Sequence, residues 1–193
     1  MTTPQLRKDA ARNWDRIIAT ARELVDRGAA LQLNDVARRT GVGVATVYRH
    51  FPTPEALLES VAAPCLEELA AHGRDALAEP DPWRALQVFL SSTVEAQVAD
   101  AALAPVFAAP ANALPRTAEL KSELAAAGTE LLARARAAGA VRPDLAAADL
   151  VPLMCGVAQA VNVHGGARAD RLATAQHYLA LLLEGVRTPP RST

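Results

Sequence analysis

Residues 33–51 read LNDVARRTGVGVATVYRHF, and this stretch decides the fold of the N-terminal part of the chain. Apolar residues at helical spacing predict one short helix over Leu33–Arg39 and another over Val44–His50. The intervening Thr40–Gly43 predicts a tight turn, because glycine tolerates backbone angles that other residues avoid. Phe51 precedes a proline, which disfavours further helix. The pattern is that of a helix-turn-helix.

The second of these helices carries side chains suited to the major groove of DNA. A helix fits that groove, and its first residues must be short enough to approach base edges. Residues 44–46 (Val-Ala-Thr) meet this requirement, and residues 48–50 (Tyr-Arg-His) carry groups suited to phosphate oxygens. Val47 is expected to point into a small core with Val36, Ala37 and Ile18.

Charge is distributed unevenly along the chain. Residues 1–52 hold nine Lys and Arg against five Asp and Glu, whereas the remainder holds 11 against 16. A basic head on an acidic body indicates that the head meets a polyanion. The alternative is random scatter of charge over a small protein whose formal net charge is −1.

Helical periodicity dominates the 193 residues, and the alternation typical of strands is nearly absent. Ala and Leu carry most of the 51% apolar fraction, which favours helix. We therefore predict an all-α fold of about nine helices. Outside the helix-turn-helix, the expected helices cover about 9–27, a stretch from 54 onward, 82 to about 102, at most one short helix within 105–115, a long helix ending near 138, and then 147–164 and 170–186.

Two segments, Thr53-Pro54-Glu55 and Asp81-Pro82-Trp83, predict helix starts, because each places a capping side chain before a proline. Pro64 lies inside the helix that begins at residue 54 and should kink or split it. Such a kink could be a hinge that responds to a ligand, or a passive irregularity that packing tolerates.

The cysteines and histidines predict no metal site or disulfide scaffold. Cys65 and Cys155 lie far apart and match no zinc or redox spacing. Cys155 is expected to pack as a small hydrophobe, with redox sensing as the alternative. His72, His164 and His177 form no metal-binding spacing. We expect neither a metal nor a cofactor.

The chain predicts no contact with a membrane. Its start has no apolar segment typical of a signal peptide. The longest apolar stretch, 150–163, is interrupted and too short to span a bilayer. The expected location is cytoplasmic.

The stretch from Arg16 through Leu58, RIIATARELVDRGAALQLNDVARRTGVGVATVYRHFPTPEALL, resembles the DNA-binding domain of the tetracycline-repressor (TetR) family of bacterial regulators. The shared features are a helix, a glycine, a second helix with Val-Ala, a Gly-Val turn and then Thr-Val-Tyr-x-His-Phe. The rest of the chain resembles the family only in length, helical content and helix count.

The resemblance implies a two-domain helical protein that acts as a homodimer. Residues 1–52 would form the DNA-binding domain, with the helix-turn-helix at about 33–51. Residues 53–187 would form the effector-binding and dimerisation domain, and 188–193 a tail. A small molecule in the second domain would move the fourth helix, spread the two recognition helices and release a palindromic operator.

The resemblance also places Val44, Ala45 and Thr46 at bases, and Tyr48 and His50 at phosphates. There are two departures from the family pattern. Gln32 replaces the usual capping Thr, which leaves a capping role for Asn34, and Pro54 replaces the usual Lys, which leaves its phosphate contact to Arg49 or the basic arm Arg7–Arg12. The expected DNA-contacting residues are Gln32, Asn34, Arg38, Gly43, Val44, Ala45, Thr46, Tyr48, Arg49 and His50.

The effector pocket is expected to be mostly apolar with a few polar groups, which suits a small hydrophobic molecule. Its candidate residues, any of which could instead lie at a dimer seam or on the surface, are Phe89, Gln97, Asp100, Phe107, Asn112, Met154, Gln159 and Asn162. The final helix carries an apolar stripe wide enough for a second subunit, with packing inside one chain as the alternative. The expected interface residues are Leu172, Tyr178, Leu179, Leu182, Leu183 and Val186.

The sequence as a whole predicts a ligand-responsive transcriptional regulator, a repressor that releases double-stranded DNA when it binds a small hydrophobic molecule. The rivals are a helical enzyme and a helical dimer that does not bind DNA. An enzyme is disfavoured, because we find no Gly-rich phosphate loop, no paired His/Glu motif and no recognisable Ser/His/Asp set. A purely structural dimer would not need the basic first quarter.

Overall fold

A computed structural model describes the chain from residue 3 to residue 188. Over this range the chain forms nine α-helices, which confirms the predicted all-α fold. Val141 and Arg187 also form an isolated antiparallel β-bridge. The helices are α1 (Thr3–Asp26), α2 (Leu33–Thr40), α3 (Val44–His50), α4 (Pro54–Ala78), α5 (Pro82–Ala99), α6 (Leu103–Ala108), α7 (Pro115–Ala137), α8 (Ala147–His164) and α9 (Arg168–Val186).

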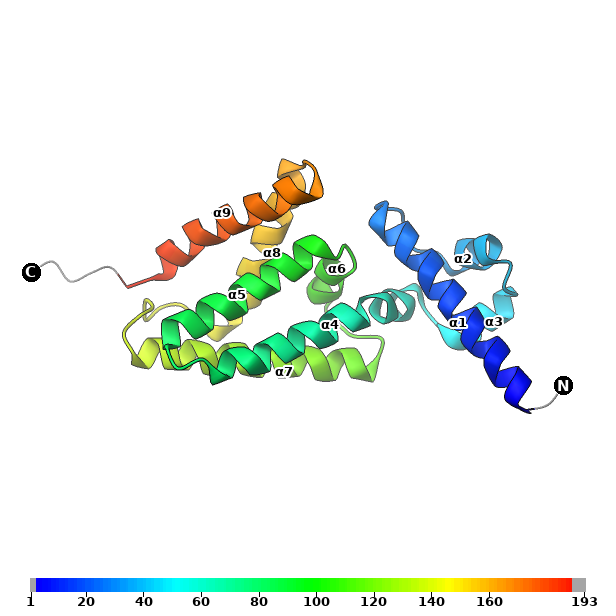
Figure 1. Cartoon of the computed structure of the whole chain (residues 1–193), viewed down its shortest axis with the longest axis horizontal. Helices are drawn as coiled ribbons and strands as arrows, with labels where there is room; N and C mark the ends of the chain where they lie inside the picture. The colour runs from blue at the N-terminus through cyan, green and yellow to red at the C-terminus, as the bar shows by residue number, and fades with distance from the viewer. Residues whose placement is uncertain (1–2, 189–193) are drawn as a thin grey trace, which may run out of the picture.

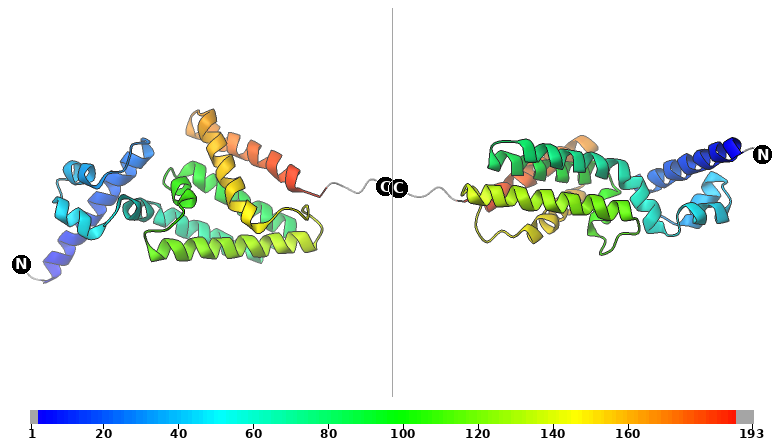
Figure 2. Two further views of the ribbon diagram at one scale, coloured as in Figure 1. Left: turned by 180° about the vertical axis from the view of Figure 1, so that it is seen from behind. Right: turned by 90° about the horizontal axis from the view of Figure 1, so that it is seen from below.

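The helices form an elongated molecule with a small N-terminal unit at one end (Figure 1). Helices α1, α2 and α3 make up this unit, and α4 leads from it into a larger body. Within the body α4 packs along α7 and α5, and α5 also packs against α8 and α9. The views from behind and from below show the same separation of unit and body (Figure 2).

A compact core holds the N-terminal unit together. Ile17, Val36 and Val47 have no exposed surface, and Phe51 is 1% exposed. The ring of Phe51 packs on Trp14 with centroids 4.4 Å apart. Val47 therefore points inward as predicted, although Ile17, rather than the half-buried Ile18, is the fully buried partner from α1.

The predicted helix starts are confirmed by their caps. The Thr53 hydroxyl accepts a hydrogen bond from the Ala56 amide at 3.1 Å, and the Asp81 carboxylate accepts one from the Arg84 amide at 2.7 Å. Gly41 ends α2 with φ 67°, a left-handed conformation that a side chain would strain. Local sequence signals are thus enough to set these boundaries.

Helix α4 is continuous from Pro54 to Ala78, so Pro64 does not split it, and the alternative that the proline kinks the helix stays a prediction. A proline removes one backbone donor, whereas Val61, Ala62 and Leu66 on either side are buried and hold both halves in the body. Pro105 is likewise accommodated in α6, because its missing amide hydrogen falls in the first turn, where no helical acceptor is available.

Some boundaries shift. Helix α1 begins at Thr3 rather than near residue 9, and α9 at Arg168 rather than 170. Helix α5 ends at Ala99 rather than near 102, because Asp100 and the turn after it lead into α6. In the part of the chain that the structure describes, no helix is long and apolar enough to cross a bilayer.

Candidate nucleic-acid interface and ligand cavity

Helix α3 presents most of its surface to solvent. Among its described residues, Val47 alone is buried. Val44 is 50% exposed and Tyr48, one turn later, is 45% exposed. Ala45 and Arg49 are exposed in the same way, again four positions apart. One face of α3 therefore anchors the helix, and the opposite face carries the predicted base- and phosphate-contacting side chains.

The turn before α3 is fixed by polar contacts. The buried hydroxyl of Thr40 donates to the Val36 carbonyl at 2.8 Å and accepts from the Val42 amide at 3.3 Å. The Arg16 guanidinium donates to the Thr40 carbonyl. Sequence reasoning did not single out Thr40 or Arg16, which have the supporting role of holding α2 and α3 at a set angle.

All ten predicted DNA-contacting residues lie at the surface of the N-terminal unit. Thr46 and His50 are half-buried, and the other eight are exposed. The His50 ring packs edge-on against Trp14, with centroids 5.8 Å apart. Arg38 pairs with Asp35 at 2.8 Å on the exposed side of α2. The residues thus gather on α3 and the adjoining surface of α2.

The remaining parts of the predicted surface are less constrained. Gln32 is the N-cap residue of α2, and within the described chain its side chain makes no capping hydrogen bond, as expected from the loss of Thr. Asn34 is exposed beside it. In the basic arm, Lys8 and Arg12 are exposed on α1, and the side chain of Arg7 lies outside the described residues.

A second feature is a cavity of about 350 Å³ in the body, enclosed by α5, α6, α7 and α8 and open at one side. The cavity is lined by Phe89, Leu90, Thr93, Gln97, Phe107, Lys121, Leu124, Ala125, Gly128, Thr129, Ala147, Ala148, Leu150, Val151 and Met154. Carbon side chains dominate this lining, and the volume falls in the range of small-molecule sites.

Four of the eight predicted pocket residues line this cavity, namely Phe89, Gln97, Phe107 and Met154. The other four lie elsewhere, because they are exposed or engaged in other contacts. Asn112 is exposed in the loop before α7, and Gln159 is exposed on α8. Asn162 is exposed and accepts a hydrogen bond from Arg171, and Asp100 lies at the junction described below.

The cavity has few polar groups, and most are already engaged. The hydroxyls of Thr93 and Thr129 donate to carbonyls of the preceding turn, both at 2.8 Å. The Lys121 ammonium donates to the carbonyls of Val106 and Ala109 at 3.0 and 3.4 Å. Burial lowers the pKa of Lys121, although the nearby Glu59 carboxylate acts in the opposite direction.

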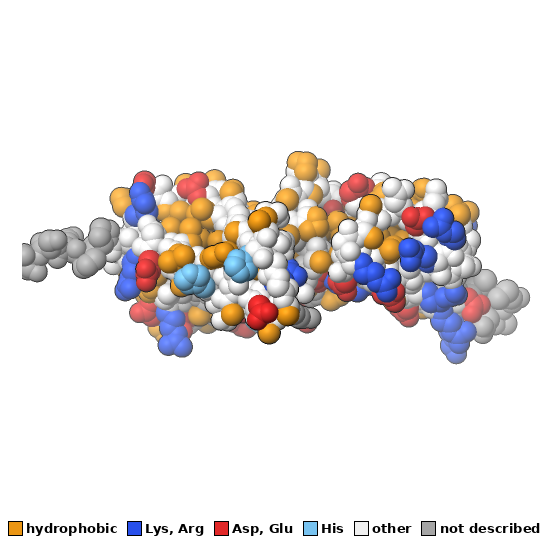
Figure 3. Space-filling model, turned by 90° about the horizontal axis from the view of Figure 1, so that it is seen from above, with side chains coloured by type: hydrophobic (Ala, Val, Ile, Leu, Met, Phe, Trp, Pro, Cys, Tyr) orange, Lys and Arg blue, Asp and Glu red, His pale blue; other side chains and the backbone are white. Residues whose placement is uncertain are grey.

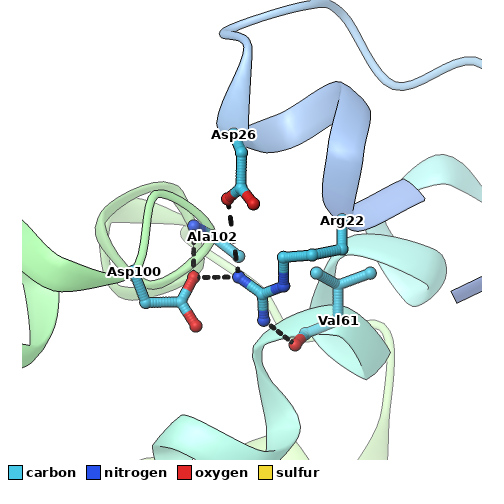
Figure 4. Close-up of polar contacts among 5 residues, drawn as sticks. All are labelled: Arg22, Asp26, Val61, Asp100 and Ala102. Carbon is cyan, nitrogen blue, oxygen red and sulfur yellow. Dashed lines mark hydrogen bonds and ion pairs between the residues drawn. The ribbon is translucent and has the colours of Figure 1, made fainter. Parts of the chain in front are cut away.

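A polar junction joins the N-terminal unit to the body (Figure 4). The Arg22 guanidinium of α1 bonds to the Asp100 carboxylate and donates to the Val61 carbonyl of α4 at 2.5 Å. Asp26 lies 4.0 Å from the same guanidinium. Asp100 also accepts from the Ala102 amide at 2.8 Å. Arg22 therefore touches both α4 and the turn that starts α6, whose Phe107 lines the cavity.

Two further polar contacts went unpredicted. The buried Glu59 carboxylate of α4 accepts from the amides of Ala113 and Leu114 at 2.6 and 2.8 Å. Lys121 of α7 holds the end of α6 through the carbonyls named above. Charged residues in helices usually form a solvated face, so the sequence offers no signal for these contacts, which depend on helices brought together by the fold.

The cysteines lack the character of redox sensors. Burial raises the pKa of the Cys65 thiol to about 11, helped by the carboxylates of Asp100 and Glu68. Burial also raises the pKa of Cys155. Reactive cysteines have lowered pKa values instead. Across residues 3–188, no cluster of three or more His, Cys, Asp or Glu side chains could hold a metal ion.

The six residues predicted for the dimer interface differ in burial. Leu179, Leu183 and Val186 are buried in the core of the chain itself, as the alternative interpretation of packing inside one chain had it. Leu172, Tyr178 and Leu182 are half-buried. The outer surface of α8 and α9 instead exposes other apolar side chains, with Val163 at 78% and Leu181 at 56%. Hydrophobic side chains are plentiful over the body in the view from above (Figure 3).

The exposed helix-turn-helix on a two-part helical fold defines the class of the protein, a DNA-binding transcriptional regulator. The family model for bacterial regulatory proteins of the tetR family matches residues 17–61. The model for the C-terminal domain of SbtR-like transcriptional regulators matches residues 81–188. The chain belongs to the TetR family.

Relatives agree with this assignment. The chain is 31% identical to the TetR transcription regulatory protein from Mycobacterium vanbaalenii, over 95% of this chain and 99% of that one, with a TM-score of 0.50. It is 30% identical to the TetR regulator SCO0520 from Streptomyces coelicolor, over 91% and 99%, with a TM-score of 0.54. It is also 31% identical, over 80 residues, to the HTH-type transcriptional regulator SAR0097 from Staphylococcus aureus (strain MRSA252). That match spans 40% of this chain and 42% of the relative's length.

Proposed function

We propose that the chain is a ligand-responsive repressor that binds a palindromic DNA operator as a homodimer and releases it when a small, largely apolar molecule enters the cavity. The observation that carries this proposal is the pairing of two features in one chain. An exposed recognition helix lies at one end, and a preformed apolar cavity of about 350 Å³ lies in the body behind it. We propose no catalytic role, and a cytoplasmic location, where the operator would be.

The proposed DNA contacts follow the exposed side of α3. Val44, Ala45 and Thr46 would meet base edges, because they stand at the N-terminal end of the helix and have short side chains. Tyr48 and Arg49 would contact phosphates from the next turn. Gln32, Asn34, Arg38, Gly43 and His50 would support these contacts from the adjoining surface.

A second copy of the chain would cover the outer surface of α8 and α9. Gly156, Ala160 and Val163 follow one another at four- and three-residue steps on the exposed side of α8, and Ala173 and Leu181, eight residues apart, are exposed on α9. Small and apolar residues on adjacent exposed helices allow close packing against the same surface of a second copy. The half-buried Leu172, Tyr178 and Leu182 would border this seam.

The proposed division into domains follows the first cap. Residues 1–52 would be the DNA-binding domain, and residues 53–187 the effector-binding and dimerisation domain, with Thr53 capping the helix that links them. Apart from Thr188, the predicted tail 188–193 lies outside the described residues.

Helix α6 would transmit effector binding to the DNA-binding unit and so cause release of the operator. Phe107 and Lys121 touch the cavity from α6 and α7, and Asp100 joins the start of α6 to Arg22 in the N-terminal unit. A molecule that displaced α6 would therefore change the contacts of Arg22 with both Asp100 and Val61. A change in these contacts would alter the angle at which each recognition helix is presented.

Fluorescence anisotropy with short duplexes from the region upstream of the chain's own gene tests this function. A regulator of this class binds one duplex preferentially, and its affinity falls steeply between two salt concentrations, because phosphate contacts release counterions. Light scattering on the same sample should give the mass of two chains. A monomer, or equal affinity for all duplexes, would contradict the proposal.

A further inference from the structure

The side chain of Gln97 projects from α5 into the lining of the cavity. The residue is 2% exposed, and its amide oxygen Oε1 lies out of contact with solvent. No donor within residues 3–188 reaches this oxygen. Gln97 is thus a buried hydrogen-bond acceptor left without a partner in the chain.

An unpaired acceptor of this kind is costly. Leaving a buried polar atom without a hydrogen bond destabilises a fold, whereas an apolar side chain of similar size carries no such penalty. Unpaired buried polar groups are few in native proteins and call for a specific explanation. Gln97 is one of the residues that line the cavity, so a bound molecule is a source for the missing donor.

The polar groups that share the cavity are committed elsewhere. The hydroxyl of Thr93, one turn before Gln97, donates to the Phe89 carbonyl, and that of Thr129 donates to Ala125. The Lys121 ammonium is held by two carbonyls at the end of α6. These groups supply no donor to Gln97 Oε1, and a molecule bound in the cavity can supply one.

We propose that the effector is a largely apolar molecule that carries a hydroxyl or N–H group, and that this group donates a hydrogen bond to Gln97 Oε1. This inference rests on the proposed function, because it names the ligand class for the same cavity. The apolar body packs among Phe89, Phe107 and Met154, and the donor fixes its orientation. An apolar molecule without a donor fills the same volume but leaves the acceptor unpaired.

Two probes that share one ring system test the inference. 2-Naphthol offers a hydroxyl donor on an apolar ring system, and 2-methoxynaphthalene offers the same rings with an acceptor oxygen only. Binding is measured by calorimetry on the full chain and on two variants. Gln97→Leu removes the acceptor, and Gln87→Leu is the matched control, because Gln87 lies on the same helix α5 outside the cavity lining.

The full chain should bind 2-naphthol on the order of ten-fold more tightly than 2-methoxynaphthalene, the ratio that one net hydrogen bond supplies. Gln97→Leu should erase this preference while still binding 2-methoxynaphthalene. Gln87→Leu should keep this preference. Equal affinity of the full chain for both probes, a preference that survives Gln97→Leu, or binding of neither probe would overturn the inference.

Operator release is recorded on the same samples, so that the two proposals fail separately. If both probes release the operator equally well, the repressor function stands and the role of Gln97 is wrong. If 2-naphthol shows the Gln97-dependent preference but the chain binds no upstream duplex, the ligand class stands and the repressor function is wrong.

Discussion

The Arg22 guanidinium in α1 bonds to the Asp100 carboxylate at the end of α5, a residue 78 positions away. The Asp100 side chain is 12% exposed and that of Arg22 is 31% exposed. The same guanidinium reaches the Val61 carbonyl. This contact gives the recognition unit a direct link to the part of the body that borders the cavity, whereas the more exposed pairs Arg74–Glu123 and Arg116–Glu67 join α4 to α7 within the body.

Replacing Arg22 by Met should therefore lower the free energy of unfolding by about 1–3 kcal/mol, because a largely buried carboxylate loses its charged partner. Urea titration measures the change. Arg27→Met is the matched control, since Arg27 pairs with Glu23 on an exposed surface of the same helix, where both side chains are 67% exposed. That control should move the free energy by less than about 0.5 kcal/mol. An equal loss of unfolding free energy in the two variants would show that the contact between Arg22 and Asp100 stabilises the fold no more than an exposed ion pair does.

The recognition helix makes two separable predictions about DNA affinity. Thr46→Ala should change the preference among operator sequences, because Thr46 is proposed to meet a base. Arg49→Ala should weaken binding to all sequences alike and reduce the salt slope by about one unit. Anisotropy titrations at several salt concentrations measure both effects. Arg116→Ala is the control, because Arg116 is exposed on α7 in the body; wild-type behaviour of both α3 variants would place the interface elsewhere.

The cavity can be blocked from its mouth. Ala125 lines the cavity on α7 and is exposed, so Ala125→Phe should fold normally and place a ring in the opening. We expect this variant to keep operator affinity within a factor of about two and to lose 2-naphthol binding, since the added ring occupies the apolar volume. Ala126→Phe adds the same ring to an adjacent exposed position outside the lining. Loss of binding in both variants would point to disturbed folding of α7.

The half-buried thiol of Cys65 gives a pH-dependent prediction. Its pKa is raised from 9.0 to about 11, so the folded chain holds the thiol proton more tightly than the unfolded chain does. The resulting stabilisation is complete below pH 9 and disappears as the pH rises through about 11. At pH 8, native Cys65 should react with iodoacetamide on the order of 100-fold more slowly than in urea, as peptide mapping can measure. Equal rates would contradict the assigned environment and revive a sensing role.

The sequence predicted those features that depend on local physics. The caps at Thr53 and Asp81, and the glycine turn at Gly41, are short-range signals, and the structure confirms each. The buried and exposed sides of α3 follow from a period of 3.6 residues and one buried position, Val47. These signals are sufficient to locate the proposed interface with DNA.

The sequence could not predict which residues meet across the fold. Asp100 stands among apolar neighbours, which suits a pocket residue as well as an ion-pair partner, and only the packing of α1 on the body selects Arg22. Leu179 and Leu183 belong to an apolar stripe on α9 that could pack against a second subunit or inside the chain itself. Because α5 packs against α9, both side chains are buried in the chain's own core. Gln97 lines the cavity and Gln159 does not, although both are glutamines in apolar helices.

Glu59 makes the last prediction, which concerns the loop between α6 and α7. Glu59 is 3% exposed, and each carboxylate oxygen accepts one backbone N–H, from Ala113 and Leu114. Glu59→Gln keeps the shape but replaces one acceptor oxygen by an NH₂ group, which must face an N–H donor. We expect a loss of about 1–3 kcal/mol in the free energy of unfolding, measured by urea titration. Glu68→Gln, at an exposed position on the same helix, should change the free energy of unfolding by less than about 0.5 kcal/mol.

Because the loop also leads into α7, whose Lys121 holds the end of α6, Glu59→Gln should weaken 2-naphthol binding as well. A destabilised variant with unchanged ligand affinity would show that the loop supports the fold without shaping the cavity.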